Sequence, residues 1–192
     1  MSLPQIFYLY LLALTIAFLE VQVEGEHGWA AKLPCWRPAG RWYARLYTRV
    51  LGGKEMTGYH IGVFSFAFLM FHLPYVWGLP WSMSAEFATL SAFFLFVVVW
   101  DFLWFVVNPH YGISRFRPGC ITWHRIWLGP APIDYYAGLA FSFLFHALRV
   151  DTGEGTGYGA WLTASGSFAV LVVATICIVE IVPRIKKRSA TL

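Results

Sequence analysis

Apolar residues in this chain are grouped into long runs that are separated by short polar and basic stretches. Five runs are candidate membrane spans, at residues 3–22, 59–79, 86–107, 133–149 and 161–182. A helix that crosses the hydrocarbon layer of a membrane needs roughly 20 mostly apolar residues. The pattern therefore predicts an all-α fold, a polytopic integral membrane helical bundle of about five transmembrane helices that forms a single domain over residues 1–192.

The composition agrees with this class of protein. The chain is 58% hydrophobic, 19% aromatic and only 12% charged, whereas about a quarter of the residues of soluble domains are charged. The first apolar run has no basic residue before it and no small-residue cleavage site after it, so we expect it to remain as a helix. Three cysteines, Cys35, Cys120 and Cys177, show neither CxxC spacing nor even pairing, which gives no reason to expect a disulfide framework or a structural zinc site.

Lysine and arginine are distributed unevenly among the loops. Thirteen of the fourteen lie in loop 23–58, loop 108–132 or the tail 183–192, and only Arg149 lies on the opposite side of a five-span topology. Because basic loops stay in the cytoplasm, this predicts an outside N-terminus and an inside C-terminus. With no organelle-targeting segment visible, we expect the cytoplasmic (inner) membrane of a prokaryote. The positive charge then has anionic lipid headgroups as its partner, and nucleic acid is not expected.

The stretch RWYARLYTRV predicts a short amphipathic helix at about residues 40–51. Its arginines, Arg41, Arg45 and Arg49, recur every four residues, and aromatic and aliphatic residues fill most of the other positions. This pattern suits a helix that lies in the membrane interface with its arginines toward lipid phosphates. The alternative is a loop helix that packs on the bundle.

Asp101 stands inside the apolar run WDFLWFVV, which makes it the most unusual residue of the chain. The rise of a helix places it about 9 Å below the cytoplasmic end of its span. An ionisable group at that depth is costly unless it is paired, so Asp101 is a candidate functional residue. Trp104 and Asn108 are expected on the same helical face. A structural alternative is a buried pair with Arg115, Arg117 or His60 that only holds a loop.

Other polar residues are predicted at the same membrane level, with the loop 108–132 as their cover. The predicted polar site contains Asp101, His60, Glu20, Asp134, Asn108, His110 and His124. Carboxylates and imidazoles bind divalent metals and move protons, and they also contact polar headgroups. For a divalent metal the candidate ligands are His60, Asp101 and His124, although no HExxH, ExxH or HxxxH spacing supports them.

Two histidines deeper in the bundle suggest an alternative from electron transfer. His72 and His146 each lie thirteen residues into a span, so they are expected at similar depth, where facing imidazoles could hold haem b with Arg149 near a propionate. The competing interpretation is hydrogen-bonded packing of each histidine on its helix.

Small residues mark expected helix contacts, at Gly58 and Gly62 and at Gly138 and Ser142. The large aromatic surfaces elsewhere leave three kinds of neighbour open: lipid, a hydrophobic ligand, or a second protein in a homo-oligomer or with a membrane partner subunit. The chain shows no nucleophile elbow, P-loop or dinucleotide fingerprint, and this leaves open whether it is an enzyme. A structural or accessory subunit is therefore a third interpretation beside the polar site and the cytochrome.

Overall fold

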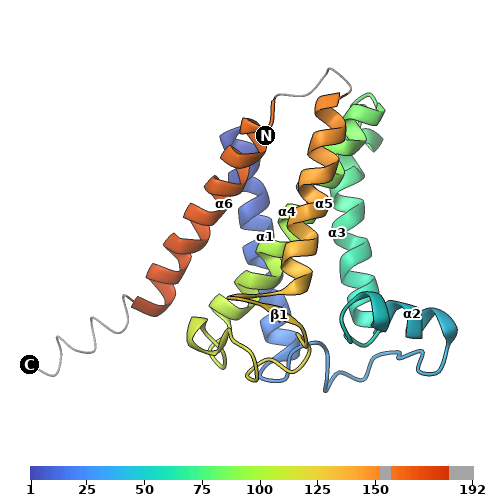
Figure 1. The fold of residues 1–192 in the computed structure, drawn as a ribbon, viewed down its shortest axis with the longest axis vertical. Helices are drawn as coiled ribbons and strands as arrows, with labels where there is room; N and C mark the ends of the chain where they lie inside the picture. The colour runs from blue at the N-terminus through green and yellow to red at the C-terminus, as the bar shows by residue number, and fades with distance from the viewer. Residues whose placement is uncertain (152–156, 182–192) are drawn as a thin grey trace, which may run out of the picture.

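The computed structural model describes residues 1–151 and 157–181 and consists mainly of helices (Figure 1). The long helices are α1 (Leu3–Glu24), α3 (Gly58–Val76), α4 (Met83–Val107), α5 (Ile133–Asp151) and α6 (Gly159–Ile176), and α6 continues into the π-helical segment η2 (Cys177–Ile181). The short elements are α2 (Trp42–Val50), the 3-10 turn η1 (Ile113–Arg115) and an antiparallel pair of strands, β1 (Trp127–Leu128) and β2 (Ala131–Pro132).

Four of the long helices are apolar enough and long enough to cross a membrane, namely α1, α3, α4 and the segment Gly159–Glu180. They indicate a membrane protein and fit the predicted multi-pass helical bundle. Helix α5 has 19 residues but carries Asp134, Arg149 and Asp151, and it is not among the four. The count of five spans therefore stays a prediction. The basic tail 183–192 lies outside the described residues.

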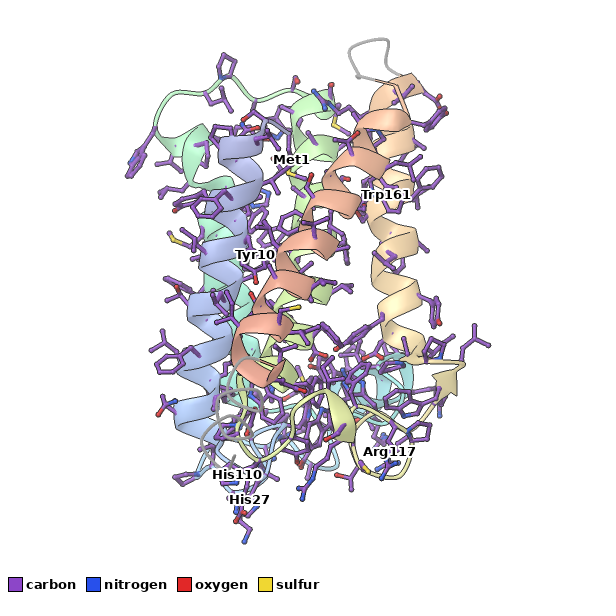
Figure 2. The ribbon with its side chains drawn as sticks, turned by 90° about the vertical axis from the view of Figure 1, so that its left-hand side faces the viewer. Met1, Tyr10, His27, His110, Arg117 and Trp161 are labelled. Carbon is purple, nitrogen blue, oxygen red and sulfur yellow. The ribbon has the colours of Figure 1, made fainter. Side chains whose placement is uncertain are left out.

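The two basic loops lie at the same end of the bundle. Met1 and Trp161 are near one end, and His27, His110 and Arg117 are at the other (Figure 2). This end, which we call the loop end, carries residues 25–57 and 108–132 (Figure 1). Their shared position is the arrangement that the positive-inside count requires of these two loops.

Helix α4 forms the centre of the bundle. Half of the residues in its apolar stretch are buried, compared with 11% of those in α3. Helices α1 and α5 both pack against α4. Its side chains Phe96, Leu103 and Phe105 are almost fully buried. Helix α6 crosses α1, where the Tyr10 hydroxyl donates to the Leu171 carbonyl at 3.0 Å (Figure 2). Helix α3 packs on α4 through aromatic pairs along its length, which include Phe64 with Trp100 and Phe71 with Phe96.

Close packing of α4 and α5 depends on the small residues that the sequence marks in this region. A Cβ atom at Gly138 would lie 2.5 Å from Val98 Cγ2, and the buried Ser142 hydroxyl donates to the Ser91 carbonyl at 2.8 Å. The predicted contact at Gly138 and Ser142 is therefore confirmed. The expectation for Gly62 is wrong, because a Cβ atom there would meet open space.

Gly138→Ala should lower the free energy of unfolding by about 1 kcal/mol or more, because the added methyl group forces α5 away from Val98. Thermal unfolding in a mild detergent measures the change. Gly62→Ala is the matched control and should leave stability unchanged or raise it slightly. Val98→Ala introduced with Gly138→Ala should recover part of the loss, and a Gly138→Ala protein as stable as the parent contradicts the close packing.

Candidate functional site: a cleft with an apolar and a charged end

A cleft of about 670 Å³ lies between α3 and α5, with α4 as its third wall. Its deeper part is apolar and is lined by aromatic and aliphatic side chains that include Phe64, Phe94, Val97 and Phe141. Its loop end is charged and is lined by Lys54, His60, Asp101, His124 and Asp134. The cleft is therefore amphipathic along its length.

The charged end is organised around His124, whose side chain is fully buried. Its Nε2 lies 3.3 Å from Asp101 Oδ2, and its Nδ1 lies 3.2 Å from Asp134 Oδ2. Asp101 also accepts a hydrogen bond from the Tyr135 hydroxyl. A histidine placed between two carboxylates can exchange a proton with either of them, so the arrangement is chemically able to pass a proton.

Lys54 completes this network. Its ammonium group pairs with Asp134 and lies 4.7 Å from the centre of the Trp29 ring, and the residue is only 7% exposed. Burial lowers the pKa of His124, but its contacts with Asp101 and Asp134 outweigh burial and hold the pKa above the ordinary value. Lys54 and His124 thus alternate with two carboxylates, and this mutual pairing is what permits ionisable side chains at so buried a place.

A second and much smaller cavity, of about 30 Å³, shares His60 and Asp101 with the cleft. Glu20 and Glu24 line it together with several tryptophans, and Glu20 accepts a hydrogen bond of 2.7 Å from Trp100 Nε1. The His60 ring stacks on Trp29 at 3.8 Å and meets the Thr57 hydroxyl at 2.7 Å. The cavity is large enough for a water molecule beside the carboxylates.

The structure brings together five of the seven residues of the predicted polar site. Four of them, Asp101, His60, His124 and Asp134, line the cleft, and Glu20 joins Asp101 and His60 at the small cavity. The other two, Asn108 and His110, belong to the loop that follows α4 and do not line the cleft. Asn108 Nδ2 donates to the Gly25 carbonyl at 2.9 Å, and Asn108 Oδ1 accepts from the His110 amide. The side chain of His110 is exposed at the loop end (Figure 2).

The metal and haem interpretations gain no support from the side-chain geometry. Among the described residues, no group of three or more His, Cys, Asp or Glu side chains is arranged to hold a metal ion. His72 Nδ1 lies 2.8 Å from the Phe68 carbonyl and Nε2 lies 3.0 Å from Glu86 Oε1, so both ring nitrogens are engaged. His146 is buried on α5. In this arrangement His72 has no nitrogen to offer to iron.

Helix α2 lies at the mouth of the cleft, within the predicted range 40–51. Trp42, Leu46 and Val50, which follow one another at helical spacing, are 70%, 52% and 71% exposed. They form an apolar face that the rest of the described chain leaves uncovered. Of the predicted surface arginines, Arg41 precedes the helix, Arg45 donates to the Gly40 carbonyl at 2.7 Å, and Arg49 lines the cleft.

Three site residues were not predicted from the sequence: Lys54, Trp29 and Tyr135. In the sequence, Lys54 is only one of several basic loop residues, and no motif surrounds Trp29. The sequence offers one signal for Tyr135, which follows Asp134, so that two polar side chains stand together at the start of a span.

Trp123 also lines both cavities. Its indole ring fits there only because Gly28 has no side chain, since a Cβ atom at Gly28 would lie 2.2 Å from the ring.

No protein-family model, curated protein or solved structure matches this chain. The cleft and its charged end are therefore interpreted from their own geometry.

Proposed function

We propose that the chain is a five-span membrane protein that binds one lipid-like amphiphile in the cleft. The apolar chain of the ligand lies between α3 and α5, and its polar head lies against the network of His124, Lys54 and the two carboxylates. Basic loops hold the loop end on the cytoplasmic side of a prokaryotic inner membrane. The observation that carries the proposal is the lining of the cleft, which changes from aromatic to charged along its length.

The position of the cleft favours an amphiphile over a water-soluble ligand. Its walls belong to α3 and α4, two of the helices that are apolar enough to cross a membrane, and to α5. An apolar space at this level is filled favourably by an acyl chain. The exposed apolar face of α2 supports a position of this helix in the headgroup layer. The charged end of the cleft would then lie at the same level. A proton relay through His124 remains a prediction that lipid binding does not require.

Cross-linking with a photoactivatable lipid tests this proposal. The probe is a monoacylglycerol with a diazirine in its acyl chain, and protein in mild detergent is irradiated, digested and mapped by mass spectrometry. Labels should concentrate on cleft residues such as Phe64, Phe94 and Phe141, and an excess of unlabelled monoacylglycerol should prevent them. Labels spread evenly over α1 and α6, or labels that excess lipid does not displace, indicate annular lipid and contradict the proposal.

A cleft-filling substitution with a matched control sharpens the test. Ala137 and Ala140 are both exposed on α5, but only Ala137 lines the cleft. Ala137→Trp should abolish most of the saturable labelling, and Ala140→Trp should preserve it. Thermal unfolding of both variants establishes that each is folded. If Ala137→Trp is folded and labels like the parent, no ligand occupies the cleft and the structural or accessory role is favoured.

A further inference from the structure

A second hollow on the surface of the loop end adjoins the cleft. This hollow, the outer groove, measures about 600 Å³ and is lined by α2, by residues 38–40, 52–53 and 55–56, and by Arg125 and Ile126. Arg49, Gly52, Arg125 and Ile126 line both spaces. Arg49 and Arg125 therefore lie at the border of the two spaces, within reach of the head of a ligand whose apolar chain fills the cleft.

Positive charge at this junction has no acidic partner. Arg49 and Arg125 are both exposed, and neither forms an ion pair within the part of the chain that the structure describes. The nearby acids are already engaged, since Asp134 pairs with Lys54 and Glu55 accepts from Arg37 at 2.6 Å. The junction thus carries unneutralised guanidinium groups beside a charge network that is already paired.

The side chain of Arg125 lies against the loop that follows α2. Gly53 has a φ of +99°, and a Cβ atom there would lie 2.6 Å from Arg125 Cδ and 2.8 Å from Nε. The glycine therefore leaves room for the arginine side chain at the junction, where a Cβ atom would displace it.

Guanidinium groups recognise phosphate through paired hydrogen bonds from their planar fork. Given the amphiphile proposed above, on which this step rests, we infer that the ligand carries a phosphate in its head and that Arg49 and Arg125 bind that phosphate. The source is an anionic lipid, because the same junction is continuous with the apolar cleft. The network of His124 and Lys54 lies behind the phosphate and contacts the linkage between head and chain.

Two competitors that differ only in the phosphate test this inference. Phosphatidic acid and diacylglycerol with identical acyl chains are titrated against the photoactivatable probe. Phosphatidic acid should compete at a concentration about tenfold lower, the advantage expected from charge-assisted hydrogen bonds. The variant Arg49→Gln/Arg125→Gln should remove this advantage and leave competition by diacylglycerol unchanged. Arg41→Gln should retain it, because Arg41 is an exposed arginine immediately before α2 that lines neither space.

The outcomes separate this inference from the proposed function. Equal competition by the two lipids, with cleft labelling intact, overturns the phosphate site and leaves the amphiphile cleft standing. Failure of both lipids to compete overturns the amphiphile itself. Inorganic phosphate is added at the same concentration as phosphatidic acid. If it abolishes the advantage, the junction binds the free anion and the lipid assignment is overturned; if it has no effect, the lipid assignment is supported.

Discussion

Replacing Lys54 with methionine should lower the free energy of unfolding by about 2 to 3 kcal/mol, since removing one member of a buried ion pair leaves the other without compensation. Lys54 is almost completely buried and is paired with Asp134. The expected loss is at the lower end of the range for buried pairs because the Asp134 side chain is 26% exposed and keeps its contact with His124. Thermal unfolding in mild detergent measures the change.

The control is Lys32→Met, which makes the same substitution at an exposed lysine in the same loop. It should change stability by no more than about 0.5 kcal/mol. Lys54→Met combined with Asp134→Asn should recover a substantial part of the loss, because the unpaired carboxylate is removed. Equal stability of the Lys54→Met and Lys32→Met proteins means that the ion pair contributes nothing to the fold.

The helices were readable from the sequence because each is determined largely by its own residues. The apolar runs gave α1, α3, α4 and α6 within a few residues, since a lipid environment leaves a helix as the only way to satisfy the backbone of a single apolar segment. Helix α5 was predicted as well, as the shortest run. Because α5 carries charged residues near both ends, it is not among the four helices that are long and apolar enough to cross a membrane.

The site was only partly readable, because its partners come from segments whose path the sequence does not reveal. The depth of Asp101 correctly marked it as a group that needs partners. The structural alternative named Arg115, Arg117 or His60 as its partner, but Arg115 donates to the His110 carbonyl and Arg117 to Cys120 Sγ. The partners of Asp101 are His124 and Tyr135. Predicting them required the fold of loop 108–132, which depends on its tertiary contacts.

Asn108 does not line the cleft for a related reason. Asn108 was expected on the face of Asp101 by extending the helical spacing, but α4 ends at Val107. The Asn108 backbone leaves the helical conformation there, and its side chain reaches the Gly25 carbonyl of another loop. Helical periodicity therefore predicts shared faces only as far as the helix continues.

The stability of the protein should fall as the pH rises from about 6.5, the ordinary pKa of histidine, to above the folded pKa of His124. The groups that face this imidazole are Asp101 from α4, Asp134 and Tyr135 from α5, and Lys54 from the loop after α2. The two carboxylates hold the pKa of His124 above its ordinary value despite burial. A group whose pKa is raised on folding stabilises the fold fully below its unfolded pKa, and this contribution is lost as the pH passes the folded pKa.

His124→Gln isolates this contribution, because glutamine is polar and does not titrate. At low pH within this window the variant should be less stable than the parent by about 3 kcal/mol, since two charge-assisted contacts are lost. The difference should shrink as the pH rises, because the parent loses its imidazolium and the variant has none to lose. Thermal unfolding of both proteins across the window measures the two slopes, and ring ¹⁵N spectra follow the proton on His124 directly. Parallel slopes in parent and variant contradict a charged histidine between the two carboxylates, and so does a titration below the ordinary pKa.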